Sequence, residues 1–153
     1  MYSSIKHLPT FVRSLLMGAL LIFLLPSQVE AQNKSIEKVK STLHAQSELW
    51  NKGDIEGFME YYWKSDQLQF IGSNGITKGW QATLERYQKS YPDAAAMGKL
   101  RFEILDVTQR SRKVISLVGK FYLSREMGDL EGTFLLIWKK VKGKWVIVSD
   151  FTA

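Results

Sequence analysis

Residues 50–80 read WNKGDIEGFMEYYWKSDQLQFIGSNGITKGW, a stretch that carries three of the five tryptophans of the chain. Gly53 ends one expected helix, and Asp54 can cap the next one by accepting a hydrogen bond from its first N–H groups. The pair Asn74-Gly75 indicates a tight turn between two short strands. Aromatic residues that cross so many element boundaries favour one concave space lined by side chains, which is the usual form of a small-molecule site.

The hydrophobic periodicity extends this reading to the rest of the chain. It predicts helices over Ser35–Asn51, after Asp54, and from Trp80 to Tyr91. A loop of small residues, 94–98, then precedes a series of strands. The expected strands are Leu68–Ile71, Ile76–Lys78, Lys99–Val107, Val114–Leu123, Thr133–Lys140 and Lys144–Phe151. The order α-α-β-β-α-β-β-β-β predicts an α+β fold with helices packed on an antiparallel sheet.

Two of the late strands lack the alternation that a sheet with one solvated face shows. The runs FLLIW (134–138) and WVIV (145–148) place apolar residues on both faces. Three helices cover only one face of a curved sheet, so a second copy of the chain is the simplest cover for the other face. We therefore expect a homodimer, the alternative being a monomer with an exposed apolar patch.

The first 31 residues are typical of a signal peptide. Lys6 and Arg13 precede the apolar run Ser14–Leu25, and small residues follow up to an expected cleavage site after Ala31. The alternative is a membrane anchor, but the run is shorter than the about 20 residues that a spanning helix needs. We expect a single domain over residues 32–153 that is periplasmic or secreted, with no stable membrane span after cleavage.

Composition excludes several classes of site. The chain has no cysteine, and His44 is the single histidine of the expected domain, so neither a disulfide nor a metal site is expected. There is no G-x-S-x-G elbow and no phosphate-binding loop, and we expect no cofactor. The formal net charge is +6, but its basic clusters coincide with turns and match no nucleic-acid motif, so nucleic acid is not expected as a partner.

The order of elements, with WxxGD between the first two helices, resembles the nuclear-transport-factor-2-like superfamily, which includes ketosteroid isomerase, polyketide cyclases and scytalone dehydratase. Within it the chain is most similar to an uncharacterised group of exported bacterial proteins. The segments that carry the resemblance are Trp50–Asp54, Tyr62–Asp66, Gly79-Trp80, Arg86-Tyr87, Tyr91–Asp93, Gly143–Val148 and Asp150–Thr152.

The resemblance implies a cone-shaped fold in which three N-terminal helices pack on a curved antiparallel sheet. It also implies a pocket between the helices and the concave face, and dimers formed through the outer face. Relatives of this group tend to carry histidine where this chain has Phe151, so a role of that histidine would be lost here.

Catalysis is left open by the sequence. In the isomerases the general base lies in the first strand, where this chain has Phe70 and Ile71, and neither side chain can take a proton. The weak catalytic candidates are Asp150, with Arg125 as its expected partner in a pocket pair or a structural clasp, and His44, which is more typical of a solvent-facing position.

The candidates for ligand contact are the aromatic residues Trp50, Tyr62, Trp63, Trp80 and Tyr87, which could equally fill the core. The first hypothesis is an exported domain that binds a small apolar or amphipathic molecule in an aromatic-lined pocket. The alternatives are an enzyme of the isomerase, dehydratase or cyclase type, and an interaction or assembly module without a ligand.

Overall fold

The computed structural model of the protein describes residues 25–153. Residues Ile36–Ala153 form one compact unit, which contains the strands and the site described below. Most of the expected signal peptide lies outside the described residues, and its cleavage after Ala31 stays a prediction. Within the described part of the chain, no helix is long and apolar enough to cross a membrane.

The three expected helices are confirmed as α2 (Leu25–Asn51), α3 (Ile55–Met59) and α4 (Trp80–Ser90), although α2 begins before the expected start at Ser35. Gly53 has φ +82°, a backbone conformation that favours glycine, and it follows the end of α2. The Asp54 carboxylate accepts a hydrogen bond of 2.7 Å from the backbone N–H of Gly57 and so caps α3. Both local signals in the opening stretch therefore act as predicted.

A further short helix, α5 (Ala94–Met97), occupies the segment expected to be a loop. Asp93 accepts a hydrogen bond of 2.8 Å from the backbone N–H of Ala96 and caps this turn. The sequence expectation was wrong here because alanine-rich segments form helix readily once an acidic residue caps them.

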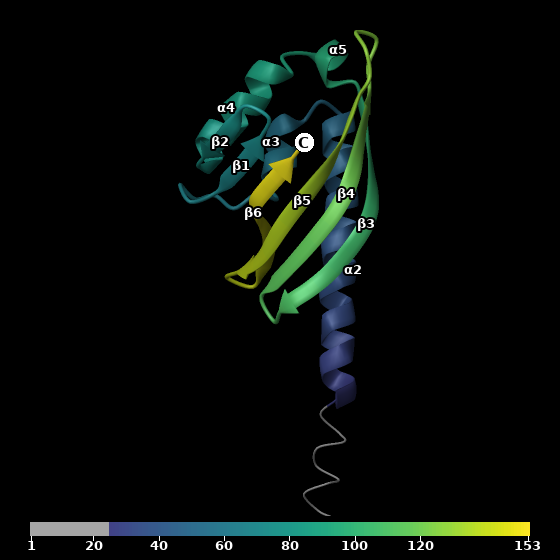
Figure 1. Ribbon diagram of the computed structural model, residues 1–153, viewed down its shortest axis with the longest axis vertical. Coiled ribbons are helices and arrows are strands. Elements are labelled where there is room, and N and C mark those ends of the chain that lie inside the picture. Colours follow the sequence, from purple (N-terminus) through teal and green to yellow (C-terminus); the bar gives the residue numbers. More distant parts are fainter. Residues whose placement is uncertain (1–24) are drawn as a thin grey trace, which may run out of the picture. The chain divides into compact units, whose positions relative to one another are not determined.

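Six strands form one sheet in the order β2-β1-β6-β5-β4-β3 (Figure 1). They are β1 (Gln69–Gly72), β2 (Gly75–Lys78), β3 (Lys99–Ser111), β4 (Val114–Ser124), β5 (Leu130–Val141) and β6 (Lys144–Thr152). All neighbours run antiparallel except β1 and β6, which are parallel. The expectation of an antiparallel sheet was wrong at this pair, since residues 73–143, rather than a hairpin turn, connect the two strands, and parallel neighbours need such a long connection.

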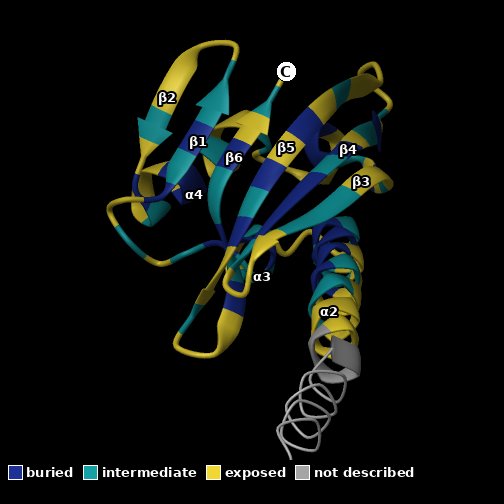
Figure 2. Ribbon diagram, turned by 60° about the horizontal axis from the view of Figure 1, so that its bottom comes forward, coloured by how far each residue is buried: buried dark blue, intermediate teal, exposed yellow. Residues whose placement is uncertain are grey.

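The core lies between the helices and the inner face of the sheet. Figure 2 shows buried and exposed bands alternating along β5, so the apolar run 134–138 places side chains on both faces. The inner side chains Phe134, Leu136 and Trp138 are buried, whereas Leu135 on the outer face is 38 % exposed. The helices thus cover one face only.

The register aligns apolar residues across the outer face. Ile71 lies opposite both Ile76 and Phe151, and Leu135 lies opposite both Phe151 and Val118. We call these five residues the outer row. Ile76, Phe151 and Leu135 are exposed, so the described part of the chain leaves this row without a cover.

Candidate functional site

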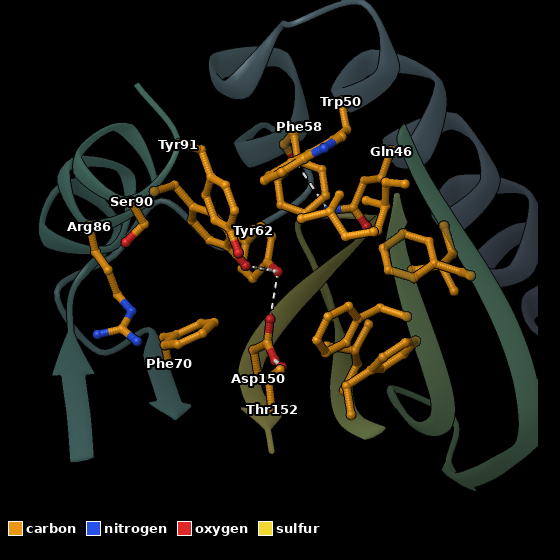
Figure 3. Close-up of a pocket in the computed structure, with 18 residues that line it drawn as sticks. Gln46, Trp50, Phe58, Tyr62, Phe70, Arg86, Ser90, Tyr91, Asp150 and Thr152 are labelled. Carbon is orange, nitrogen blue, oxygen red and sulfur yellow. Dashed lines mark hydrogen bonds between the residues drawn. The ribbon is translucent and has the colours of Figure 1, made fainter. Parts of the chain in front are cut away.

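A cavity of about 130 Å³ lies between the helices and the inner face of the sheet (Figure 3). Most of the side chains that line it are aromatic or aliphatic, and Ser90 is the exposed one among them, so the cavity reaches solvent near the end of α4. The polar lining residues are Gln46, Tyr62, Arg86, Tyr87, Ser90, Tyr91, Asp150 and Thr152. This pattern of an apolar wall with a few polar groups is typical of small-molecule sites.

Six aromatic residues form one connected group in the cavity wall, which we call the aromatic cluster: Trp50, Phe58, Tyr62, Phe70, Tyr87 and Tyr91. Its ring centroids lie 4.8 Å apart for Trp50 and Tyr91 and 5.4 Å apart for Phe58 and Tyr87, both in edge-to-face contact. Such contacts fix the rings relative to one another. The wall is therefore built from α2, α3, α4 and β1 together.

The backbone of β6 positions Tyr62. The N–H of Ile147 donates to the carbonyl of Tyr61 at 2.9 Å, and the N–H of Trp63 donates to the carbonyl of Ile147 at 2.8 Å. These two bonds attach the segment after α3 to β6. As a result, the Tyr62 hydroxyl reaches Asp150, further along the same strand, and donates a hydrogen bond of 2.6 Å to its Oδ2.

Asp150 is a buried carboxyl group with two hydroxyl donors. The residue is 3 % exposed, and Thr152 donates a second hydrogen bond, of 2.7 Å, to its Oδ1. Burial raises the pKa of Asp150 above its ordinary value, while the bonds from Tyr62 and Thr152 lower it and partly oppose that effect. The group is thus held closer to its neutral form than a surface aspartate.

The tyrosine hydroxyls extend this network towards α4. The hydroxyl oxygens of Tyr62 and Tyr87 lie 3.5 Å apart. Burial, followed by the nearby charge of Asp150, raises the pKa of both tyrosines well above the usual value. Both phenols therefore stay protonated at neutral pH and act as hydrogen-bond donors and acceptors, not as bases.

Gln46 of α2 is a polar lining residue that the sequence analysis missed. Its Nε2 donates a hydrogen bond of 3.1 Å to the carbonyl of Phe58, which fixes the orientation of the amide. Its Oε1 is buried and accepts no hydrogen bond from the described residues. The signal was present in the sequence, because Gln46 lies three residues after Leu43 and four before Trp50 on the buried stripe of the helix.

The five predicted ligand-contacting aromatics separate into two groups. Trp50, Tyr62 and Tyr87 line the cavity, whereas Trp63 and Trp80 do not. The indole Nε1 of Trp80 donates to the carbonyl of Met59 at 2.9 Å, and the Lys64 ammonium lies 5.0 Å from the centre of its ring. These contacts place Trp80 outside the cavity, where it packs α4 against the end of α3.

The three catalytic candidates do not come together. Asp150 lines the cavity and lies opposite Leu136 of β5, which in turn lies opposite Leu117 of β4. The expected partner Arg125 follows the last residue of β4, at the other end of that strand. The Arg125 guanidinium instead donates to the carbonyl of Gly128 at 2.8 Å and holds the β4–β5 turn. The predicted pairing of Asp150 with Arg125 was therefore wrong.

His44 lies away from the cavity lining. Its side chain is 77 % exposed, and Nε2 lies 4.0 Å from a carboxylate oxygen of Glu48, one turn along α2. This is the solvent-facing position that the helical pattern favoured.

The first strand presents no base to the cavity. Phe70 lines it, whereas Ile71 belongs to the outer row. Phe70 lies directly opposite Asp150 in the parallel pair, so the carboxyl group of the site comes from the neighbouring strand. Phe151 also belongs to the outer row and is not among the residues that line the cavity, so its side chain points away from the site.

The fold is shared with solved structures. A nuclear-transport-factor-2-like protein of unknown function from Shewanella oneidensis is 34 % identical, with a TM-score of 0.73 over 76 % of this chain and 96 % of that one. A ketosteroid isomerase-like protein from Erwinia carotovora is 17 % identical, with a TM-score of 0.62 over 78 % and 95 % of the two chains. A nuclear-transport-factor-2-like protein from Pseudomonas putida is 12 % identical, with a TM-score of 0.63 over 79 % and 87 %. No protein-family model and no curated sequence matches the chain.

Proposed function

The chain belongs to the nuclear-transport-factor-2-like superfamily, and we propose that it binds a small apolar or amphipathic molecule in the cavity between its helices and its sheet. The observation that carries this proposal is an aromatic-lined space that Trp63 and Trp80 leave unfilled, with one buried acid in its wall. Its volume of about 130 Å³ is close to that of an engineered apolar cavity that binds benzene. A ligand of about one ring in size fits this description.

Native mass spectrometry of protein purified from its own compartment tests this proposal. We expect a small molecule to co-purify with the protein and to be lost when Phe58 is replaced by tryptophan, which fills the cavity. Ser73→Ala, in the exposed β1–β2 turn, is the matched control that keeps the ligand. A protein that carries no small molecule and binds no ring-sized probe would contradict the proposal and would favour an assembly module instead.

We also propose that the protein forms a homodimer through the outer row. An exposed apolar row across five neighbouring strands is unusual for a monomer, and a two-fold pair would bury it against itself. The same mass spectrum reports the oligomeric state. A monomeric protein at micromolar concentration would contradict this part of the proposal.

We propose that the protein is exported to the periplasm or the medium. It rests on the leader pattern of residues 1–31. The intact mass of the purified protein tests it, since cleavage after Ala31 removes those residues. A full-length mass in the cytoplasmic fraction would contradict it.

An enzyme is a second candidate because of one specific observation, the 2.6 Å bond between Tyr62 and a buried Asp150 whose pKa is raised. A neutral carboxylic acid beside a tyrosine can polarise a carbonyl group, as in ketosteroid isomerase. Phe70 stands where a general base is expected, so the substrate would have to supply or exchange its proton through solvent. Turnover of an unsaturated ketone that is lost in Asp150→Asn would support this candidate, and no turnover by the wild type would remove it.

A further inference from the structure

The polar groups on the deep wall of the cavity offer more acceptors than donors. Around Asp150 and Gln46, the hydroxyls of Tyr62 and Thr152 donate to Asp150, and one of the two N–H groups of Gln46 Nε2 donates to the carbonyl of Phe58. The acceptors keep spare capacity. Each carboxylate oxygen of Asp150 accepts one bond from the described residues although it can accept two, and Gln46 Oε1 accepts none. A complementary ligand therefore brings hydrogen-bond donors.

The charge of the site points to the same chemistry. Asp150 is the only acidic residue in the cavity lining, and none of the ion pairs among the described residues includes it. The one basic lining residue, Arg86, lies on α4 with its guanidinium 4.8 Å from the centre of the Phe70 ring. A carboxylate buried without a cation is costly, and a bound cation would remove that cost.

The aromatic cluster supplies the remaining element. Six rings form part of the wall of the cavity that Asp150 also lines, and the faces of aromatic rings attract organic cations, more strongly when the site excludes water. Ring faces together with one carboxylate select a cationic nitrogen from neutral molecules of the same size. An uncharged apolar ligand would contact the rings but would leave the Asp150 carboxylate without an opposite charge.

We propose that the ligand is a small organic amine, bound as its ammonium ion, which donates to Asp150 and lies against the aromatic cluster. Gln46 Oε1 is a second acceptor on the α2 side of the cavity. This inference rests on the proposed function, since it assigns the chemical class of the ligand to the same cavity. It makes Asp150 the specificity-determining residue.

Three probes of similar size test it with the protein purified from its own compartment: benzylamine, benzyl alcohol and toluene, measured by calorimetry at neutral pH. We expect benzylamine to bind at least about tenfold more tightly than benzyl alcohol, because charge-assisted hydrogen bonds are about twice as strong as neutral ones and the rings add to them. This preference should be lost in Asp150→Asn, while toluene binding stays within about threefold of the wild type. Gln46→Met should reduce the amine affinity less than Asp150→Asn does.

A second test uses the wild-type protein alone, so it does not depend on the Asp150→Asn variant. Lowering the pH protonates Asp150, so the affinity for benzylamine should fall on acidification while that for benzyl alcohol stays level. The other charged or titratable groups facing the site are Arg86, Tyr62, Tyr87 and Tyr91. Burial raises the pKa of all three tyrosines, so their phenols stay neutral over the acidic range.

The outcomes separate this inference from the proposed function. If toluene binds and benzylamine is no tighter than benzyl alcohol, the amine assignment is overturned and the binding function stands. If the amine preference persists in Asp150→Asn at full strength, the assignment to Asp150 is overturned. If none of the three probes binds, both proposals fail together.

Discussion

Replacing Tyr62 by phenylalanine removes one hydroxyl from the cavity wall and leaves the ring of the aromatic cluster in place. Asp150 then keeps Thr152 as its single hydroxyl donor. A hydrogen bond to a charged group contributes about 1.5–3 kcal/mol. We therefore expect Tyr62→Phe to lower the free energy of unfolding by about 2 kcal/mol at pH values where Asp150 is ionised.

The loss should depend on pH with a sign that Asp150 determines. Burial raises the pKa of this carboxyl in the folded protein. The contribution of Asp150 to the free energy of unfolding is therefore complete below the pKa of this carboxyl group in the unfolded chain. It is lost as the pH rises through the pKa of the group in the folded protein. The Tyr62 bond lowers the folded pKa and so opposes this loss. Removing the bond makes the loss of stability with rising pH larger. The free energies of unfolding of wild type and variant should therefore differ least at acidic pH and most above the pKa of Asp150 in the folded variant.

Urea unfolding followed by tryptophan fluorescence, from about pH 4 to about pH 9, measures this difference. Tyr87→Phe is the matched control, because its hydroxyl lies 3.5 Å from that of Tyr62 and should contribute less than about 1 kcal/mol. Equal losses for the two variants, or a Tyr62→Phe loss that is the same at every pH, would refute the account of a buried carboxyl supported by Tyr62.

Three further substitutions test the packing around the site and the outer face. Gly119→Ala should lower the free energy of unfolding by about 1–3 kcal/mol, because a Cβ there would lie 2.5 Å from the Phe134 ring; an unchanged urea midpoint would count against this packing. Asn51→Ala should cost about 2 kcal/mol, since the amide bonds both the N–H and the carbonyl of Leu100, at 2.7 Å and 3.0 Å; a loss below about 0.5 kcal/mol would show that these bonds are not formed. Leu135→Glu should convert the proposed dimer to monomers in analytical ultracentrifugation without a change in circular dichroism, and a dimer that persists would rule out the outer row as the interface.

Local sequence patterns predicted the ends of helices correctly where the interactions that fix those ends lie within a few residues. The helix stop at Gly53 and the cap at Asp54 depend on residues within one turn, and both were confirmed. These signals therefore located the end of α2 and the start of α3, whereas α2 begins at Leu25, before the expected start at Ser35. Asp93 carried the same kind of cap signal for α5, and there the small residues after it were assigned to a loop.

Partners across the fold could not be predicted in the same way. The expected pair of Asp150 with Arg125 failed because spacing along the sequence says nothing about which strands become neighbours. Trp63 lies outside the cavity lining although it follows Tyr62 directly. The backbone hydrogen bonds that attach this segment to β6 direct the neighbouring side chains of Tyr62 and Trp63 to different sides. These bonds join segments that are far apart in the sequence, so local patterns do not reveal them.

The sequence by itself determined three of the four described helices, the six strands and a stretch rich in aromatic residues, because hydrophobic periodicity, caps and turns are encoded within a few residues. Its motifs also carried the resemblance to the fold family. Only the tertiary structure decided which of those aromatics face the cavity. It also decided that the acid of the site is Asp150, beside Phe70 and bonded to Tyr62. The physical reason is that the parallel pairing of β1 with β6 is a long-range contact, and the residues that it joins carry no mark of it in the chain.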